Sequence, residues 1–259
     1  MTLFVGTSGW AYKEWKPDFY PAETKQKEFL SHYSSLLSAC EINATFYRLQ
    51  KHETFARWAQ EVPAGFRFSI KAHRRLTHGK TISPETDQGE FLTAFLRSLQ
   101  PLEDRLGALL FQFPPYRKKD VSSLAALMDR LPTEKCAFEF RDPSWSDTDV
   151  TEMIVQRGGT VCVADTTGAS PTVLPGGRIA YIRMRFDDYS ADQRTSWLRL
   201  LESESRDRDV FAFTKHEGVA ADSPFAGVGL AVWLQEQNEQ GESARQDQLA
   251  PPPGTEATQ

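Results

Sequence analysis

The chain has 259 residues, a formal net charge of −5, a hydrophobic fraction of 40% and a charged fraction of 25%, values that fit one barrel or two small globular domains. The pI of about 5.6 argues against nonspecific nucleic-acid binding, and no apolar run approaches the roughly 20 residues that span a bilayer. Because the first residues, MTLFVGTSG, do not resemble a signal peptide and the three cysteines form no CxxC pair, we expect a cytoplasmic protein with buried free thiols and with neither membrane nor nucleic acid as partner.

Short apolar runs alternate with amphipathic segments along most of the chain. We predict strands at Leu3–Gly6, Ala39–Asn43, Phe66–Lys71, Leu106–Phe113, Cys136–Arg141, Val161–Asp165, Ile179–Arg183 and Val210–Phe213. Between the strands, segments such as 90–99 and 120–131 carry apolar residues at helical spacing. Eight such units in roughly 235 residues match a closed parallel barrel. An open doubly wound sheet alternates in the same way, but its first turn carries a glycine-rich phosphate loop, and GTSGW at 6–10 is not one. The sequence therefore favours an α/β fold, a single-domain (β/α)8 barrel of the TIM type.

The composition changes at about residue 238. Gln, Glu, Pro, Gly and Ser dominate from there on, and Leu249 is the only large aliphatic residue. Such a segment has too little apolar surface to offset the entropy lost on ordering. We predict a barrel domain over residues 1–237 and a disordered tail over residues 238–259.

Polar residues share one parity within several of the predicted strands. Glu41 and Asn43 alternate with apolar residues, and the parity of Arg183 continues to Arg185. Because successive side chains of a strand point to opposite faces, and the apolar parity must cover the helices, we expect the polar parity to point into the barrel. Its polarity grows toward the carboxyl ends of the strands, where barrel enzymes build their sites. The residues expected to converge there are Glu41, Asn43, Lys71, Gln112, Glu139, Arg141, Asp165 and Arg183.

This expected ring carries charges of both signs. Its carboxylates are Glu41, Glu139 and Asp165. They could ligate a divalent metal or divide into an acid and a base. Its cations are Lys71, Arg141 and Arg183. They would oppose a metal ion and instead suit a phosphate or carboxylate group, so we predict no metal and no other cofactor, with a divalent metal left as the alternative. A structural network of mutually neutralised charges is the alternative to a site.

Residues just beyond the strand ends add further candidates. His73 and His78 follow the third strand and could carry protons near neutral pH. Hydroxyl and aromatic side chains there can hold or stack on a sugar or base, or merely close the top of the barrel. From this group we expect ligand contacts by Thr7, Ser8, Trp10, Tyr12, Tyr47 and Trp145. No serine elbow, P-loop, zinc spacing or dinucleotide fingerprint is present.

Several sequence motifs follow one another between residue 3 and about residue 233. They are GTSGWAY at 6–12 with Trp15, EINATFY at 41–47, FSIK at 68–71 followed by Thr77-His78, GALLFQFPP at 107–115, EFRDPSW at 139–145 and YIR at 181–183. The set resembles the YecE-like family (domain of unknown function 72). The resemblance implies a (β/α)8 barrel similar to sugar isomerase and endonuclease barrels, and it implies no established reaction.

Two segments depart from the family pattern. Many members carry a histidine-glycine pair after the YIR motif, where this chain reads MRFDDY at 184–189. An asparagine-rich motif near the last strand is replaced by FTKHEG at 213–218. The departures make Lys215 and His216 further candidates and put transfer of a ligand from the family in doubt on that side.

Three functions remain open from the sequence. The first is an enzyme, possible classes being isomerase, lyase and hydrolase, that acts on a small anionic or polyhydroxy ligand, sugar-like and phosphorylated or carboxylated. Its catalytic candidates are Glu41, Lys71, His78, Glu139 and Asp165. Its ligand-binding candidates are Thr7, Ser8, Trp10, Tyr12, Asn43, Tyr47, Gln112, Arg141, Trp145, Arg183 and Lys215. The second function is a metal-dependent isomerase or phosphodiesterase, and the third is a non-catalytic ligand-binding or partner-binding barrel. The sequence leaves the substrate, the reaction and the oligomeric state open.

Overall fold

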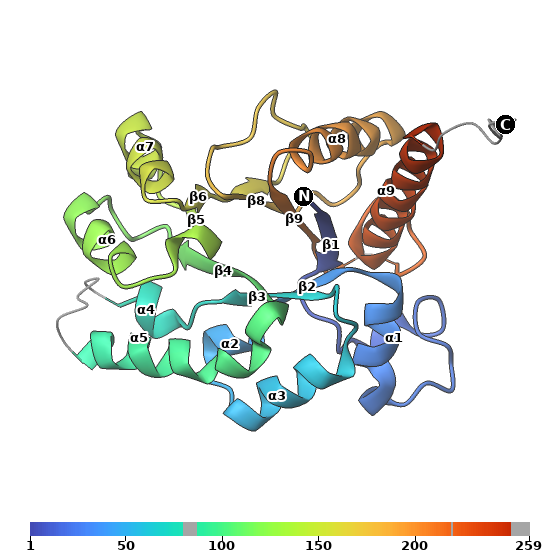
Figure 1. Cartoon of the computed structure of the whole chain (residues 1–259), viewed down its shortest axis with the longest axis horizontal. Coiled ribbons are helices and arrows are strands. Elements are labelled where there is room, and N and C mark those ends of the chain that lie inside the picture. Colours follow the sequence, from blue (N-terminus) through green and yellow to red (C-terminus); the bar gives the residue numbers. More distant parts are fainter. Residues whose placement is uncertain (80–86, 219, 250–259) are drawn as a thin grey trace, which may run out of the picture.

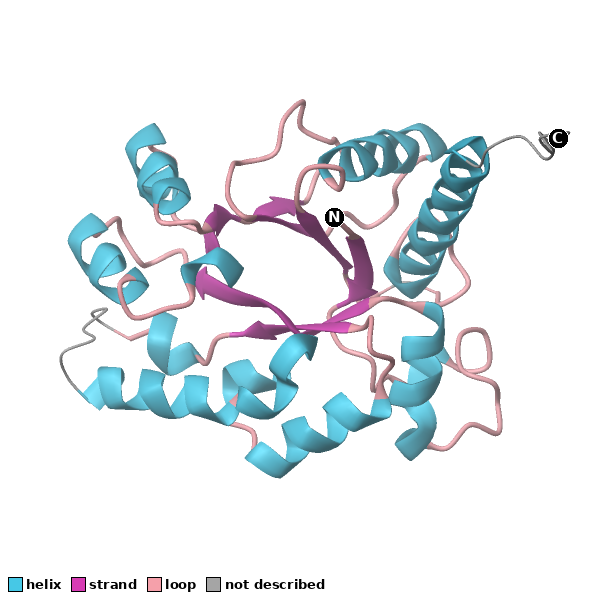
Figure 2. Cartoon of the chain, in the orientation of Figure 1, coloured by secondary structure: helices cyan, strands magenta, loops and turns pink. Residues whose placement is uncertain are grey.

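The structure is a computed structural model that describes residues 1–79, 87–218 and 220–249. The strands of this part form a nearly closed parallel ring in the order β6-β5-β4-β3-β2-β1-β9-β8-β7, and the helices surround it (Figures 1 and 2). The strands are β1 (Leu3–Thr7), β2 (Ala39–Ile42), β3 (Arg67–Lys71), β4 (Leu106–Phe113), β5 (Cys136–Phe140), β6 (Thr160–Val161), β7 (Val163–Asp165), β8 (Ile179–Met184) and β9 (Asp209–Thr214). The predicted TIM-type barrel is confirmed.

The strands β6 and β7 together occupy the sixth position of the barrel. β6 pairs with β5 and β7 pairs with β8. Cys162 lies between them, and its N–H donates to the Phe138 carbonyl at 2.9 Å. The ring is thus completed between β5 and β8 by one interrupted strand.

The helices lie outside the ring and account for most of the connections. They are α1 (Phe29–Leu36), α2 (Ala44–Tyr47), α3 (His52–Glu61), α4 (Arg74–Thr77), α5 (Asp87–Ser98), α6 (Val121–Met128), α7 (Thr148–Gln156), α8 (Ala191–Glu204) and α9 (Gly227–Leu249). The 3-10 turns are η1 (Lys13–Trp15), η2 (Gln26–Glu28), η3 (Gln100–Arg105), η4 (Thr133–Lys135) and η5 (Pro143–Trp145). Side chains fix several helix starts: Asp120 accepts from the Ser123 N–H at 3.0 Å at the start of α6, where an N–H has no partner within the helix. Residues 166–178 form a loop, so the sixth unit lacks the helix that eight regular units would have.

Apolar side chains fill the barrel toward the amino ends of the strands. Phe4 and Phe211 stack with their ring centres 4.9 Å apart, and Leu110 and Phe213 belong to the same buried cluster. Burying a large apolar side chain completely contributes about 1.5–3 kcal/mol. This apolar layer lies below the polar side chains that gather toward the carboxyl ends of the strands.

The first glycine of the GTSG motif is required by strand packing. A Cβ atom at Gly6 would lie 1.8 Å from the Ala39 carbonyl oxygen and 2.8 Å from the Tyr33 hydroxyl. Real Cβ atoms do not approach other atoms this closely, so β1 and β2 can pair here only because the side chain is absent. The Tyr33 hydroxyl uses the space to accept from the Thr7 N–H at 2.8 Å and to donate to the Ala39 carbonyl at 2.9 Å.

The carboxyl-terminal segment differs from the expected tail. Helix α9 continues to Leu249, so residues 238–249 are helical here. The first half of the helix packs against the barrel through the buried side chains of Val228, Leu230 and Leu234. The second half is rich in Gln, Glu, Ala and Arg, which are good helix formers and extend a helix without apolar contacts. The domain boundary at 237 stays a prediction, and residues 250–259 lie outside the described residues.

The three cysteines are buried free thiols, as predicted: Cys40, Cys136 and Cys162. Burial raises the pKa of each thiol, which keeps the sulfur in its unreactive protonated form. Among the described residues, no helix is both long enough and apolar enough to cross a membrane.

Candidate active site at the carboxyl ends of the strands

A cavity of about 1060 Å³ opens at the carboxyl ends of the strands. Of the residues predicted for the site, those that line it are Ser8, Tyr12, Asn43, Tyr47, Lys71, Glu139, Arg141, Arg183 and Lys215. Arg185 and His216 line it as well, and both carry a sequence signal, one through strand parity and the other through the departure at 213–218. Thr166 and Asp187 also line it and lie in loops, where no periodic pattern identifies them.

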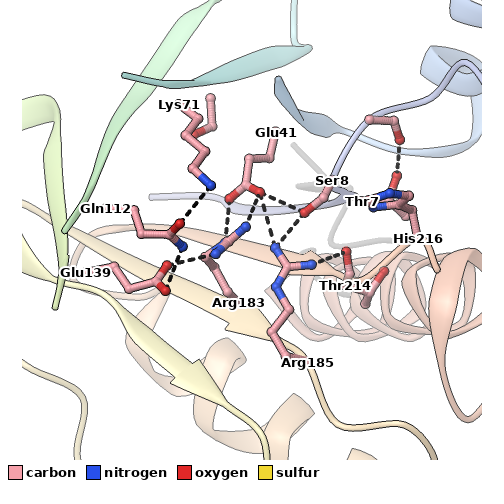
Figure 3. Close-up of polar contacts among 12 residues, drawn as sticks. Thr7, Ser8, Glu41, Lys71, Gln112, Glu139, Arg183, Arg185, Thr214 and His216 are labelled. Carbon is pink, nitrogen blue, oxygen red and sulfur yellow. Dashed lines mark hydrogen bonds and ion pairs between the residues drawn. The ribbon is translucent and has the colours of Figure 1, made fainter. Parts of the chain in front are cut away.

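Glu41 lies at the end of β2, behind the cavity wall, and is 0% exposed. Its Oε2 atom accepts from the Tyr181 hydroxyl at 2.8 Å and from Arg183 Nε at 2.9 Å. Its Oε1 atom accepts from Ser8 Oγ at 2.7 Å, Arg183 Nη2 at 2.9 Å and Arg185 Nη2 at 3.1 Å (Figure 3). Arg183 therefore grips the carboxylate through two parallel bonds, and the remaining donors occupy its other acceptor positions.

Arg183 also reaches the second buried carboxylate. Its Nη1 atom donates to Glu139 Oε2 at 2.8 Å, while Gln112 Nε2 donates to Glu139 Oε1 at 2.7 Å. The amide oxygen of Gln112 in turn accepts from Lys71 Nζ at 2.8 Å. Figure 3 shows these contacts as one chain across the inside of the barrel. Side chains from β2, β3, β4, β5 and β8 are thus held in a single hydrogen-bonded network.

The network keeps both carboxylates ionised. Burial by itself raises the pKa of Glu41, but the guanidiniums of Arg183 and Arg185 outweigh burial and hold that pKa well below its usual range. Burial also acts on Glu139, and Arg183 and the Gln112 amide lower its pKa in the same way. A carboxylate with so low a pKa is a weak proton acceptor at neutral pH. The geometry therefore suits Glu41 and Glu139 for holding the arginines in place rather than for the predicted acid–base roles.

The inner part of the cavity carries more positive than negative charge. The cations are Lys71, Arg141, Arg183 and Arg185, and the carboxylates are Glu41 and Glu139. Four cations against two carboxylates leave two positive charges unmatched among these inner residues, and the rim adds Lys215 with the carboxylates Asp187 and Glu217. Arg141 contacts Glu139 Oε1 through Nε at 3.3 Å and its side chain is 52% exposed. Its Nη1 and Nη2 atoms are therefore accessible to a ligand from solvent.

The rim of the cavity is aromatic and hydrogen-bonding. The rings of Tyr12 and His216 stack with their centres 4.4 Å apart, and Tyr47 is 71% exposed. Lys215 forms an ion pair with Asp187 on the same rim. Asn43 Oδ1 is buried and accepts no hydrogen bond from any described residue. An unsatisfied buried acceptor beside a cavity is a position that a ligand donor would fill.

Asp165 was predicted to belong to this group, but it lies outside it. It points toward α8, where its Oδ2 atom accepts from the Tyr189 hydroxyl at 2.8 Å and from Trp197 Nε1 at 3.1 Å. Cys162 and Ala164 line the cavity instead, so the parity inferred for this strand is reversed. Apart from Asp165, the residues on both faces of this strand are apolar. The rule that polar residues face inward therefore rested on a single residue and assigned the wrong face.

Thr7 and Trp10 also lie away from the cavity. The Thr7 side chain donates to the Gly9 carbonyl at 2.6 Å and lies 3.0 Å from the Tyr33 hydroxyl, so it braces the first loop. Trp10 packs edge-on against Trp58 with ring centres 5.0 Å apart. Neither residue lines the cavity.

Trp145 and His78 have structural contacts as well. Trp145 stacks on Phe140 with ring centres 4.4 Å apart, and its indole N–H donates to a backbone carbonyl at 2.7 Å. His78 lies edge-on to Phe46 at 4.9 Å between ring centres. Burial and the neighbouring Lys71 lower the pKa of His78 to about 4, so this imidazole is neutral near pH 7 and a poor general acid.

No group of three or more His, Cys, Asp or Glu side chains that could hold a metal ion lies within residues 1–79, 87–218 and 220–249. Arg183 engages both buried carboxylates of the network. A cation bound there would first have to displace a guanidinium, and the metal alternative stays a prediction.

Known proteins share this fold and sequence pattern. The family model "Protein of unknown function DUF72" matches residues 4–251. The UPF0759 protein YunF of Bacillus subtilis (strain 168) is 32% identical over 149 residues, which are 55% of this chain and 52% of that protein. The match thus spans about half the length of this curated relative.

Two crystal structures of DUF72 family proteins superpose on most of the chain. The protein from Thermotoga maritima MSB8 gives a TM-score of 0.73 at 24% identity and covers 92% of this chain and 100% of that one. The protein from Enterococcus faecalis V583 gives a TM-score of 0.69 at 18% identity and covers 93% and 98%. At these identities the similarity shows the fold alone.

Proposed function

Because this chain belongs to the DUF72 family, whose members are described as proteins of unknown function, we propose a function from the site itself: an enzyme that binds a small anionic, sugar-like molecule, phosphorylated or carboxylated, in the cavity. The observation that carries the proposal is the excess of cations over carboxylates in the inner part of the cavity, where Glu41 and Glu139 already accept hydrogen bonds from protein donors. An anion is the charge that would balance the excess. The resemblance to the YecE-like family implies no particular ligand.

The geometry around the cations supports an anion of small size. Arg141 offers its terminal nitrogens, and the buried Arg183 and the partly buried Arg185 are already oriented by Glu41. Hydrogen bonds to charged groups each contribute about 1.5–3 kcal/mol, and groups held in position lose little entropy on binding. Cavities for small molecules are typically about 300–1,000 Å³, and the observed volume of about 1060 Å³ lies just above this range.

The rim supports a ligand that also carries hydroxyl groups. Asn43 Oδ1 is an unused buried acceptor, and a sugar hydroxyl is a donor of the right kind. The exposed ring of Tyr47 offers a flat apolar surface for the face of a sugar ring. A non-catalytic binding barrel would use the same contacts, and turnover of a bound compound separates the two functions.

Thermal-shift and calorimetric titrations with paired compounds test the proposal. Inorganic phosphate, ribose 5-phosphate, glucose 6-phosphate and gluconate should raise the Tm, while ribose and glucose should not. Arg141→Gln should weaken binding of the anions at least about ten-fold, because one charged hydrogen bond contributes about 1.5–3 kcal/mol and about 1.4 kcal/mol corresponds to a factor of ten. The matched control is Arg157→Gln, because Arg157 pairs with Asp129 and borders a separate cavity near Lys135.

The expected result is that Arg157→Gln binds the anions like the wild-type protein. Absence of any Tm shift with every anion would overturn the proposal. Equal weakening by both substitutions would also overturn it, because the effect would then come from net charge and not from the site.

A further inference from the structure

Lys71 has an unusual partner for a buried lysine. It stands at the end of β3 and is only 9% exposed, yet its Nζ atom donates to the neutral amide oxygen of Gln112 at 2.8 Å. On another side Nζ lies 4.4 Å from the centre of the Phe46 ring. Buried lysines are usually held by a carboxylate. Gln112 in turn donates its side-chain N–H to Glu139. The amide group of Gln112 therefore lies between the Lys71 ammonium and the Glu139 carboxylate.

The surroundings make the neutral amine accessible near neutral pH. Burial and the positive charge of Arg183 lower the pKa of Lys71 to about 8, although Glu41 and Glu139 act in the opposite direction. In about one tenth of the molecules the Lys71 amine is then unprotonated at pH 7. A lysine that is desolvated and set beside another cation is the arrangement that activates an amine as a nucleophile.

We propose that Lys71 is a nucleophile that forms an imine with an aldehyde or ketone substrate bearing the anionic group, an inference that rests on the proposed function. The amine nitrogen adds to the carbonyl carbon, and the C–O bond then breaks. The oxygen leaves as water with the two amine protons, which yields R₂C=N–Lys from R₂C=O and H₂N–Lys. No oxidant or reductant takes part. The protonated imine withdraws electrons from the neighbouring carbon, which facilitates isomerisation or carbon–carbon cleavage next to the former carbonyl.

The placement of the cations specifies which compounds fit. Lys71, Arg141 and Arg183 line the same cavity, and Arg183 is fixed from behind by Glu41 at 2.9 Å. An anionic group held by the arginines leaves the carbonyl end of a small molecule facing Nζ. Phe46 covers the amine on its apolar side. The substrate class is therefore a short carbonyl compound with a phosphate or carboxylate group.

Reductive trapping tests the inference. The probes are dihydroxyacetone phosphate, glyceraldehyde 3-phosphate and pyruvate, each incubated with the protein and sodium cyanoborohydride. Glycerol 3-phosphate serves as an anion without a carbonyl. Mass spectrometry of the intact protein and of its peptides should show one adduct on Lys71, with the mass of the probe less one oxygen atom. Excess glycerol 3-phosphate should suppress the adduct.

Two substitutions complete the experiment. Lys71→Arg keeps the positive charge and removes the primary amine, so it should abolish the adduct while glycerol 3-phosphate still raises the Tm. Lys118→Arg is the matched control, because Lys118 is 77% exposed and pairs with Asp142, and it should trap like the wild type. The yield should increase between pH 7 and pH 8.5 in the wild type as Lys71 loses its proton.

The outcomes distinguish this inference from the proposed function. If glycerol 3-phosphate stabilises the protein and none of the probes labels Lys71, the imine is excluded and the anion site stands. If no anion stabilises the protein and no adduct forms, both are overturned. Labelling spread over many lysines, equal in the wild type and Lys71→Arg, also overturns the imine.

Discussion

Replacing Glu41 by Gln should destabilise the protein strongly even though the side chain keeps its shape. Glu41 is 0% exposed and is the carboxylate that Arg183 and Arg185 share. Gln keeps one oxygen and presents an amide N–H to the arginines, so Arg185 loses the carboxylate that it contacts and Arg183 loses half of its bidentate grip. Breaking a buried ion pair from one side costs about 3–5 kcal/mol.

The expected change is large compared with the whole stability of a domain. Globular proteins are stable by about 5–15 kcal/mol, so Glu41→Gln should remove a substantial part of that free energy and lower the Tm on the order of 10 °C. Urea denaturation followed by circular dichroism measures it directly. The matched control is Glu61→Gln, because Glu61 Oε1 lies 3.6 Å from Arg57 Nε in a solvent-accessible pair on α3, with side chains 33% and 65% exposed. Such pairs contribute about 0.5 kcal/mol or less.

The pH dependence gives a second readout of the same substitution. The folded-state pKa of Glu41 lies below its unfolded value, so its contribution is fully present above the unfolded pKa of about 4.3 and is lost as pH falls toward the folded pKa. The difference between wild type and Glu41→Gln should therefore be greatest near neutral pH and shrink below about pH 4. A loss at pH 7 no larger than that of Glu61→Gln would refute the reasoning, because the network would then not be a linked set of buried charges.

Further predictions follow from the contacts of Asp165 and Lys71. Asp165→Asn should lower the free energy of unfolding by about 1–3 kcal/mol, since the carboxylate accepts from Tyr189 and Trp197, and it should leave anion affinity unchanged in calorimetry because Asp165 lies outside the cavity. A parallel loss of affinity would contradict that placement. Anion affinity should fall as pH rises through about 8, where Lys71 loses its charge. Lys71→Arg should remove this dependence between pH 7 and 9, and an unchanged pH profile in that variant would assign the titration to another group.

Alternating polarity made much of the barrel predictable from the sequence. The parity within β2, β3, β4, β5 and β8 separates residues that pack under the helices from those that face inward, and this pattern is local to each strand. Glu41, Lys71, Gln112, Glu139 and Arg183 therefore lie inside the barrel where the sequence places them. Where one strand carried apolar residues on both parities, as at 160–165, the same rule assigned the wrong face.

The pairing inside the barrel depended on the tertiary structure. Arg183 meets Glu41 across 142 positions of sequence and Glu139 across 44, and no local pattern tells which carboxylate each arginine takes. Their partners are set by the register between neighbouring strands and by the closure of the ring at Cys162. The sequence by itself determined the type of fold and most of the inward-facing charges, with Asp165 as the exception. The tertiary structure decided which charges neutralise one another and which cations remain for a ligand, because hydrogen bonds depend on distances that arise only when distant strands pair.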